Sequence, residues 1–282
     1  MTFIDDIKAK ALNLYYTYNI LPSLTIAQAC LESGYGKHAP GNNLFGFKWT
    51  SGCGYDYQEL PTYEFINGKY VKVLAKFRKY DSLNDSLDDY GKLIGTRPRY
   101  KAVIESPTFI EATTEIRNAG YATSPKYTEN LNKVILTNKL YRYDYHTNPD
   151  MQITKNFKWI ESFSAAYVNG KRYYRIIEPP VAYKNNAINV LKNLQIIREH
   201  YNKPTTISYT GCLYRTEAYN SIVGGAKLSQ HKLAKAADII ISNIKPYNIY
   251  LYAKDNTDFK GYGIGKNYIH VDLRPMQAIW FY

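Results

Sequence analysis

The segments Ser229-Gln-His-Lys-Leu-Ala-Lys-Ala-Ala-Asp238 and Tyr268-Ile-His-Val-Asp272 decide how the second half of this chain is interpreted. They supply His231, Asp238 and His270, and three protein ligands are what a catalytic zinc ion usually takes while its fourth position stays open for water. Since the chain has only five histidines, two of them in this order are informative. The competing interpretation is chance, because His and Asp also serve as caps and surface residues.

The pattern around these residues predicts strands. In a strand over 268–273, His270 and Asp272 point to one face while Ile269 and Val271 point to the other, so an apolar face backs a ligand-bearing one. Asp238 stands similarly at the head of an apolar run. We expect strands over 205–210 and 236–241 as well, and a helix over 185–201.

Length and composition set the broad class. A chain of 282 residues with 45% hydrophobic content is long enough for two domains, each with its own core. It has no apolar run of membrane-spanning length, and its start lacks the basic and apolar regions of a signal peptide. We therefore expect a soluble protein made in the bacterial cytoplasm without a signal peptide. Three cysteines without paired spacing argue against disulfides and a thiolate zinc site.

Positive charge is concentrated in the second half. Residues 1–150 carry 18 Lys and Arg against 16 Asp and Glu, whereas residues 151–282 carry 18 against 8. The charges are dispersed and show no recognition-helix or zinc-finger spacing, so we do not expect nucleic acid as a partner. Attraction to an anionic polymer such as a bacterial wall fits this distribution, and solubility alone is the competing explanation.

The first half is expected to be helical with one hairpin. Apolar periodicity predicts a helix from Ile4 to Tyr18 and a second that ends at Gly34, so Glu32 falls in its last turn. Asn67-Gly68 is a strong signal for a two-residue hairpin turn, which places Glu64 on a strand.

Helix starts and a domain boundary follow further along the chain. Ser82-Leu-Asn-Asp85 resembles a capping box, and helices are expected to start at Ser106-Pro107 and Ser124-Pro125. The helical periodicity fades near residue 145. We expect a first domain over 1–145, a linker over 146–150 and a second domain over 151–282.

Glu32 has the surroundings that a general acid needs. Such a carboxyl must be protonated at the working pH, so its pKa has to lie above the ordinary value near 4.3. At the end of a helix the unpaired carbonyls disfavour ionisation, and Leu31 and Tyr35 can add desolvation. A solvated glutamate beside a helix cap is the competing interpretation.

Five motifs follow one another in the first half of the chain: Ala27-Gln-Ala-Cys-Leu-Glu-Ser-Gly34, Asn43-Leu-Phe-Gly46, Thr62-Tyr-Glu-Phe65, Phe77-Arg-Lys-Tyr80 and Gly120-Tyr-Ala-Thr-Ser-Pro-Lys-Tyr127. Through these motifs, residues 1–145 resemble the flagellar-type and autolysin-type N-acetylglucosaminidases, whose lysozyme-like, α-rich fold cleaves the glycan strands of peptidoglycan. The resemblance implies that Glu32 is the general acid and Glu64 the second carboxylate, and that Tyr121, Asn43 and Phe77 bind substrate. The family more often has Asp where this chain has Ser124.

The reaction of this first domain stays open at the level of sequence. Glu64 could activate a water, as in inverting enzymes, or could assist a substrate whose own 2-acetamido group attacks. A muramidase or a lytic transglycosylase would share one acid and a similar fold.

A second set of motifs runs through the rest of the chain: Ile153-Thr-Lys-Asn-Phe157, Tyr214-Arg-Thr216, Gly224-Gly-Ala-Lys-Leu-Ser-Gln-His231, Ala236-Ala-Asp238, Gly263-Ile-Gly265 and His270-Val-Asp-Leu-Arg274. Through these motifs, residues from 151 onward resemble the zinc D-alanyl-D-alanine carboxypeptidases of the VanY type, with the α+β fold that the hedgehog signalling domain shares. The resemblance implies one zinc ion on His231, Asp238 and His270, with Arg215 near the substrate carboxylate or the scissile carbonyl.

Two departures from this second family concern its chemistry. Ala234 stands where the family usually has Gly, and Asn267 stands where many members carry the acidic general base. Asp272, on the ligand face of its strand, is the candidate that could take the role of base. A structural or weakly active metal domain is the alternative.

The two halves together predict a bifunctional peptidoglycan hydrolase that cuts glycan strands and stem or cross-link peptides. The missing signal peptide favours a bacteriophage endolysin or a virion-associated lysin, which acts on the wall after release or as part of a virion. The expected partners are peptidoglycan, anionic wall polymers and virion components. The competing hypothesis is a wall-binding protein with one or both sites inactive.

Overall fold

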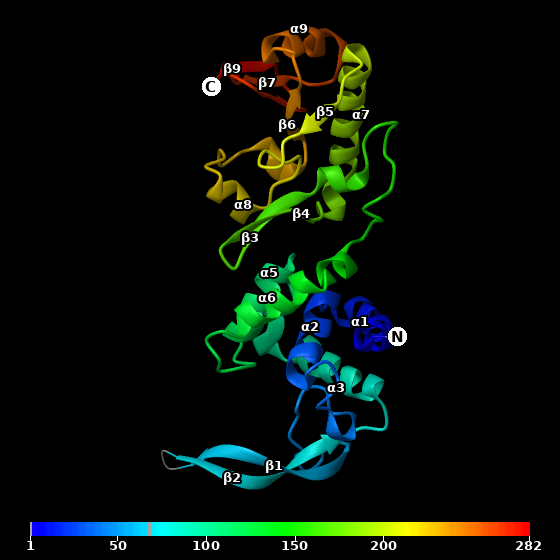
Figure 1. Ribbon diagram of the computed structural model, residues 1–282, viewed down its shortest axis with the longest axis vertical. Coiled ribbons are helices and arrows are strands. Elements are labelled where there is room, and N and C mark those ends of the chain that lie inside the picture. The colour runs from blue at the N-terminus through cyan, green and yellow to red at the C-terminus, as the bar shows by residue number, and fades with distance from the viewer. Residues whose placement is uncertain (1, 67–68) are drawn as a thin grey trace. The chain divides into compact units, whose positions relative to one another are not determined.

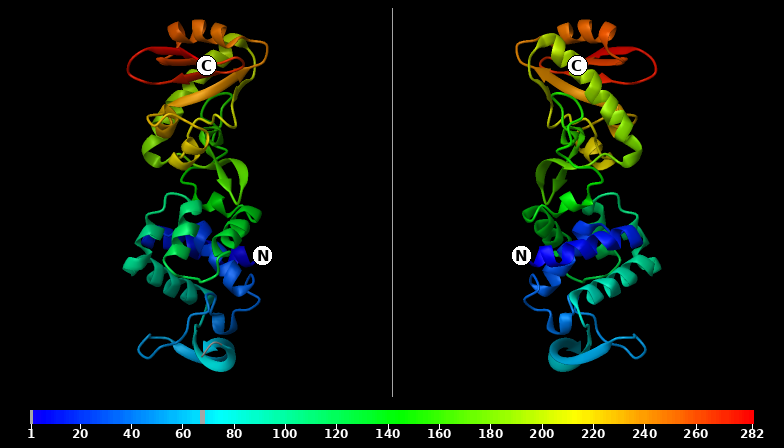
Figure 2. Two further views of the ribbon diagram at one scale, coloured as in Figure 1. Left: turned by 90° about the vertical axis from the view of Figure 1, so that its left-hand side faces the viewer. Right: turned by 90° about the vertical axis from the view of Figure 1, so that its right-hand side faces the viewer.

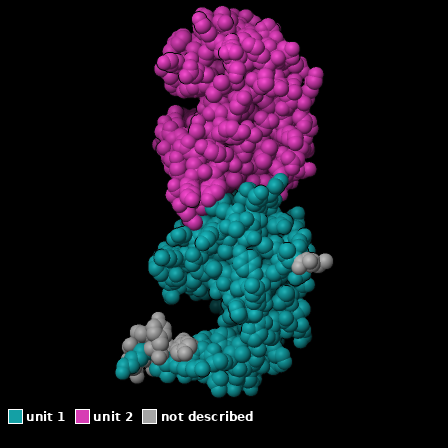
Figure 3. All heavy atoms as spheres, in the orientation of Figure 1, with its two compact units in different colours: residues 1–144 teal, residues 145–282 magenta. Residues whose placement is uncertain are grey.

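The computed structural model (Figure 1 and Figure 2) describes residues 2–66 and 69–282, and for residues 63–66 and 70 it describes the backbone alone. The chain divides into two compact units, residues 1–144 and 145–282, which Figure 3 colours separately. Residues 146–150, expected to be a linker, belong to the second unit, where the His146 amide donates to Glu178 at 2.6 Å. No helix in the described ranges is long and apolar enough to cross a membrane.

The first unit is built from helices that the sequence largely predicts. Thr2 forms a capping box with Asp5, and Ser82 forms the expected one with Asp85. The helices are α1 (Phe3–Tyr18), α2 (Pro22–Ser33), α3 (Leu83–Thr96), α4 (Lys101–Ile104), α5 (Phe109–Asn118) and α6 (Tyr127–Thr137).

Helix α2 is the centre of this unit. Ten of its 12 residues are buried, and Gly34 ends it in a left-handed conformation with φ 58°. A residue distant in sequence caps the N-terminus of this helix: Asp144 accepts hydrogen bonds from the Ser23 amide at 2.9 Å and the Ser23 hydroxyl at 2.6 Å. Burial raises the pKa of Asp144 to about 7. A residue distant in sequence therefore fixes the helix that carries Glu32.

The hairpin pairs β1 (Asp56–Ile66) with β2 (Lys69–Lys79) in antiparallel register, with Ile66 opposite Lys69. The predicted turn Asn67-Gly68 lies outside the described residues. The base of the hairpin is tied to α3, because Asp89 pairs with Arg78 and accepts a hydrogen bond from the Tyr80 hydroxyl at 2.6 Å.

The expected caps Ser106 and Ser124 are wrong. Helix α5 starts later, and Thr108 caps it by accepting from the Glu111 amide at 3.4 Å. The Ser106 hydroxyl instead donates back to the Ala102 carbonyl of the preceding helix α4 at 2.7 Å. Helix α6 likewise starts at Tyr127, beyond Ser124. Both Ser-Pro pairs form the approach to a helix and not its first turn.

The second unit contains an antiparallel hairpin and a mixed sheet in the order β5-β6-β8-β7-β9, in which β9 runs parallel to β7 and the other neighbours are antiparallel. Helices α7 and α9 pack against this sheet (Figure 2). The hairpin is β3 (Ser164–Val168) and β4 (Lys171–Ile177), the sheet strands are β5 (Thr205–Ile207), β6 (Ala236–Ile241), β7 (Gly261–Ile264), β8 (Ile269–Asp272) and β9 (Ala278–Phe281), and the helices are α7 (Lys184–Tyr201), α8 (Glu217–Ile222) and α9 (Pro246–Asn256).

The predicted helix over 185–201 and the strands over 236–241 and 268–273 correspond to α7, β6 and β8. The strand over 205–210 is shorter than predicted, because the Ser208 hydroxyl accepts from the Gly211 amide at 3.0 Å and turns the chain after Ile207. The three cysteines are free thiols, of which Cys30 and Cys212 are buried.

Candidate active sites

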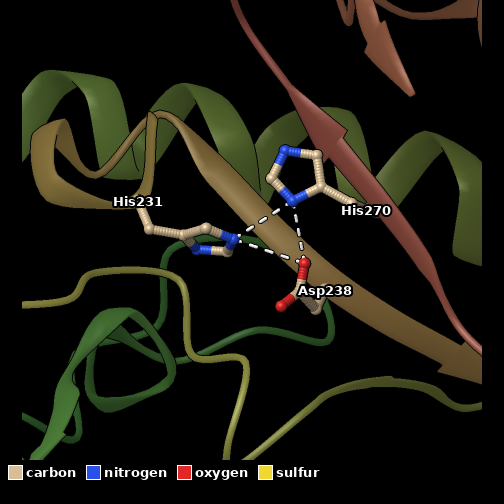
Figure 4. A group of neighbouring side chains, drawn as sticks. All are labelled: His231, Asp238 and His270. Atoms are coloured by element: carbon tan, nitrogen blue, oxygen red, sulfur yellow. Dashed lines mark hydrogen bonds and ion pairs between the residues drawn. The ribbon is translucent and has the colours of Figure 1, made fainter. Parts of the chain in front are cut away.

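Strand register brings the predicted metal ligands together. Asp238 on β6 is the direct partner of His270 on β8, so both side chains leave the sheet on one face. His231 comes from the short helix Gln230–Leu233 that precedes β6. The His231 Nε2, His270 Nδ1 and Asp238 Oδ1 atoms converge, with separations of 3.1 Å between the nitrogens and 3.3 and 2.8 Å from each nitrogen to the oxygen (Figure 4).

Ala234 stands where the resembled family usually has Gly, and the backbone at this position is one that favours Gly. It ends the turn between His231 and β6 in the left-handed conformation, with φ 53°. Glycine adopts this conformation without a steric penalty, whereas alanine costs about 1 kcal/mol or more. The chain keeps the turn geometry with a residue that fits it less well.

In each histidine, the ring nitrogen that points away from the other two residues (the far nitrogen) has a partner of its own. His231 Nδ1 lies 3.1 Å from the Leu213 carbonyl, and His270 Nε2 lies 2.9 Å from Asp272 Oδ2. Since both partners are acceptors, each far nitrogen carries the proton and each near nitrogen presents its lone pair to the common point. Two imidazole nitrogens and one carboxylate oxygen, all within 4.8 Å of one another and all buried, are consistent with a metal site.

The electrostatics of the group favour a neutral His231 and an ionised Asp238. Burial disfavours an imidazolium and lowers the pKa of His231 to about 4. Burial acts to raise the pKa of Asp238, but the charge and hydrogen bonds of His231 and His270 outweigh it and hold the pKa below its usual range. For His270, burial acts to lower the pKa, yet hydrogen bonds to Asp238 and Asp272 raise it. Asp238 is therefore an anion at the common point.

Arg215 and Asp272 each contact one residue of the converging group. Arg215 donates to Asp238 Oδ2 at 2.6 Å and to the Gly211 carbonyl at 2.7 Å, so its contacts orient a ligand. Asp272 is fully buried and accepts from His270 and from Arg274 Nη2 at 2.6 Å. This position differs from that of a general base, which has to reach the substrate side of the metal.

The three converging ligands open onto a cleft of about 890 Å³. Asn267, which stands at the family's usual acidic position, is exposed. The cleft is lined on the sheet side by Tyr268, His270, Arg274, Trp280 and Tyr282, and on the other side by residues of the segment 223–231.

In the first unit, Glu32 sits at the end of a hydrogen-bonded chain. The Tyr127 hydroxyl donates to Glu32 Oε1 at 2.6 Å and accepts from Gln28 Nε2 at 3.0 Å, while the Tyr90 hydroxyl donates to Gln28 Oε1 at 2.6 Å. Gln28 and Glu32 are four residues apart, so they share one face of α2. Sequence analysis missed Tyr127, Gln28 and Tyr90 as site residues, although the i, i+4 spacing on α2 was a usable signal.

Glu32 is exposed as a whole residue, yet desolvation of its carboxyl raises the pKa, and the Tyr127 hydrogen bond opposes that rise. A raised pKa is what a general acid requires. Tyr121 stacks on Tyr127 with the ring centroids 6.0 Å apart, and its buried hydroxyl has no hydrogen-bond partner in the described part of the chain. The structure thus links Tyr121 to Glu32 through Tyr127.

Asn43 and Phe77 lie at the base of the hairpin. The Asn43 amide donates to the carbonyls of Phe47 at 2.9 Å and Arg78 at 3.0 Å and accepts from the Phe47 amide at 3.0 Å, so it braces the loop before β1. Phe77 is half-buried on β2. Glu64 lies on β1 with its backbone opposite Val71, as the sequence predicted.

Comparison with known proteins assigns a family to each unit. Residues 8–140 match the glucosaminidase family, described as mannosyl-glycoprotein endo-beta-N-acetylglucosaminidase. Residues 171–272 match the peptidase M15 family. The three converging ligands of the second unit lie within this second match.

Several curated relatives resemble the first half of the chain. The exo-glucosaminidase LytG of Bacillus subtilis is 38% identical over 158 residues, which are 53% of this chain and 55% of LytG. The peptidoglycan hydrolase FlgJ of Salmonella typhimurium is 40% identical over 119 residues, 40% of this chain and 38% of FlgJ. The solved glycoside hydrolase domain of that FlgJ is 35% identical with a TM-score of 0.43, over 49% of this chain and 95% of the domain.

The two matches, together with the buried group of His231, Asp238 and His270, define two hydrolase domains, a glycoside hydrolase domain followed by a peptidase domain. More particularly, the first unit contains a glucosaminidase domain over residues 8–140, and the second contains a peptidase M15 domain over residues 171–272. Both resemblances expected from the sequence are confirmed. The chain spans about half or less of the length of these two curated relatives.

Proposed function

We propose that this protein is a bifunctional peptidoglycan hydrolase, which cleaves glycan strands as an N-acetylglucosaminidase with its first unit and stem or cross-link peptides with its second. The observation that carries the proposal is the second unit's buried group of His231, Asp238 and His270. Each of these side chains has a further polar partner outside the group. Relatives of the first unit named as an exo-glucosaminidase and a peptidoglycan hydrolase support the substrate.

In the first unit, which we assign a lysozyme-like fold, Glu32 would give its proton to the glycosidic oxygen as the leaving sugar departs. Tyr127 holds the carboxyl in place through its 2.6 Å hydrogen bond. Glu64 on the hairpin would either activate a water or support attack by the substrate's acetamido group. Tyr121 and Phe77 would contribute sugar contacts, and Asn43 would maintain the loop that shapes the site.

In the second unit, His231 Nε2, Asp238 Oδ1 and His270 Nδ1 would hold one zinc ion. When bound, zinc supplies an activated water and polarises the scissile carbonyl. Asp272 and the Leu213 carbonyl would keep the two imidazoles turned toward the ion, and Arg215 would keep the Asp238 carboxylate oriented. We assign Asp272 this orienting role in place of the general-base role considered from the sequence.

The testing experiment is mass spectrometry of fragments released from purified sacculi after borohydride reduction. A reduced GlcNAc end identifies a glucosaminidase, a reduced MurNAc end a muramidase and an anhydro end a transglycosylase, while new peptide termini locate the bond cut by the second unit. Glu32→Gln should remove only the glycan products and His231→Ala only the peptide products. Release of neither product from sacculi of several chemotypes would refute the proposal.

The exposed Asn267 favours a second candidate, a wall-binding protein whose peptide site is inactive, because it offers no acid at the family's usual position. Sedimentation with sacculi separates the two functions. Tight binding without new peptide termini supports the second candidate.

For origin, we propose a bacteriophage endolysin or virion-associated lysin that reaches the wall after release or within a virion. The pairing of two wall-directed domains supports this, since a lysin gains from attacking two bonds of one polymer. Lysis of intact host cells by protein added from outside supports a virion-associated role, whereas lysis only after membrane permeabilisation supports an endolysin.

A further inference from the structure

We propose that Arg274, packed against Trp280, binds a carboxylate of the substrate in the cleft of the second unit. This inference rests on the proposed peptidase function and adds the chemical group that the site recognises beside the scissile bond. It gives Arg274 one of the two roles that the family resemblance had implied for Arg215.

The two arginines that line the cleft differ in the partners and the exposure of their side chains. Arg215 is held by Asp238 Oδ2 and the Gly211 carbonyl, and its side chain is only 11% exposed. The Arg274 side chain is 30% exposed and lines the same cleft. Arg274 is therefore the arginine better able to meet a ligand.

The Arg274 guanidinium is fixed on two sides. Its Nε donates to Asp272 Oδ1 at 2.8 Å and its Nη2 to Asp272 Oδ2 at 2.6 Å, while its Cζ lies 4.7 Å from the centroid of the Trp280 ring. Its Nη1 donates to no residue within 2–66 or 69–282. A planar guanidinium held in this way is pre-organised for a carboxylate, which it binds through directed N–H groups.

Two glycines of strand β7 leave space for Arg274 and Trp280. A Cβ at Gly261 would lie 2.3 Å from Asp272 Oδ2 and 2.4 Å from Arg274 Nε, and a Cβ at Gly263 would lie 2.6 Å from Trp280 Nε1. Residues two apart on a strand share a face, so both glycines leave one stretch of β7 bare. Asp272, Arg274 and Trp280 occupy that space, which makes this corner of the cleft a built site.

The position of Arg274 relative to His270 indicates which carboxylate of the substrate it would bind. Asp272 Oδ2 is 2.9 Å from His270 Nε2 and 2.6 Å from Arg274 Nη2, so one carboxylate separates the guanidinium from a ligand imidazole. A carboxylate on Arg274 would then belong to the residue beside the scissile bond. It is either the free C-terminus of a peptide or the free α-carboxylate of a residue linked through its side chain.

The experiment uses two pairs of synthetic wall peptides with the full-length zinc-loaded protein. One pair differs in a C-terminal carboxylate against a carboxamide, and the other in a γ-linked glutamate against isoglutamine. For one pair, we expect the wild type to prefer the acid at least tenfold in kcat/KM, and that pair identifies the source of the carboxylate. Arg274→Gln should reduce the preference to near one, mainly through KM, and Arg274→Lys should restore part of it.

The matched control is Lys266→Gln, which removes an exposed positive charge that does not line the cleft and should keep the preference. Zinc stoichiometry is measured for every variant. An unchanged acid preference in Arg274→Gln with full zinc, or no preference in the wild type, overturns the proposal. Should Arg274→Gln lose zinc, Trp280→Leu carries the test because it leaves the pair with Asp272 intact, and an unchanged preference again overturns it.

Failure of the proposed peptidase function has a different signature, since the wild type would then bind zinc and cleave none of the four peptides. Calorimetric binding of the same peptides still tests the subsite in that case. Tighter binding of the acid that Arg274→Gln abolishes supports it, and equal binding of acid and amide overturns it.

Discussion

Single carboxyl groups control both proposed reactions, and the glycan reaction depends on the proton of Glu32. Desolvation raises the pKa of this carboxyl, so the acid form persists to higher pH than in an ordinary glutamate. Glycan cleavage should fall as the pH rises through that pKa, because the ionised group has no proton to donate. We expect Glu32→Gln to lower glycan release by about 10²- to 10⁴-fold. Normal release by a folded Glu32→Gln variant, judged by circular dichroism, would refute this role.

The Tyr127 hydroxyl acts to lower the pKa of the same carboxyl. It donates to Glu32 and so favours the ionised form; Tyr127→Phe should therefore raise the Glu32 pKa further and move the alkaline limb of the pH profile to higher pH. Tyr121→Phe is the matched control, because the Tyr121 hydroxyl donates to no described residue. Its pH profile should match that of the wild type. Equal profiles for both variants would contradict the tuning role of Tyr127.

Asp272 is expected to act through His270. Asp272→Asn cannot accept the imidazole proton as strongly, so zinc affinity should fall by about 10- to 100-fold while the ligands remain. His231→Ala and His270→Ala should lose stoichiometric zinc altogether. Competition with a chelator followed by elemental analysis measures both effects. Zinc retained by both alanine variants would exclude this site.

At the scale of elements, helix α2 depends on a cap that comes from the end of its unit. Asp144→Ala removes the acceptor of the Ser23 amide and hydroxyl, which should destabilise the first unit by about 1–2 kcal/mol in urea unfolding. Asp144→Asn keeps an acceptor and should cost less. A loss below about 0.3 kcal/mol for Asp144→Ala would contradict the capping role.

The same cap predicts a pH dependence. The pKa of Asp144 is about 7 in the folded chain and near 3.9 when unfolded, so the folded state holds the proton more tightly. Its contribution to stability is present at low pH and is lost as the pH rises from about 4 to 7. The wild type should therefore lose stability relative to Asp144→Asn between pH 5 and pH 8. A constant difference across that range would contradict the raised pKa.

Elements also mark where sequence patterns were sufficient. Helical periodicity and caps identified α1, α3 and α7, because these signals are local. Strands β7 and β9 escaped prediction, because Gly-Tyr-Gly-Ile and a short strand with exposed Ile279 and Phe281 carry little hydrophobic pattern of their own. Their partners in the sheet define them.

For the whole molecule, each unit has its own core, so the two activities should be separable by point substitution. Tethering two activities on one polymer raises the local concentration of each. Wild-type protein should therefore clear a suspension of sacculi faster than an equimolar mixture of Glu32→Gln and His231→Ala. Equal turbidity traces would mean that the covalent link contributes nothing to lysis.

Motifs and periodicity are local properties of a chain, so they were enough to indicate both families and to predict a metal site from the order of His231, Asp238 and His270. Which atoms converge depends on the folded chain, since the register of β6 against β8 places Asp238 opposite His270. The same structure tied Arg215 to Asp238, put Asp272 behind His270 and joined Tyr127 to Glu32. These contacts join residues that the fold, and not their spacing, brings within hydrogen-bond distance.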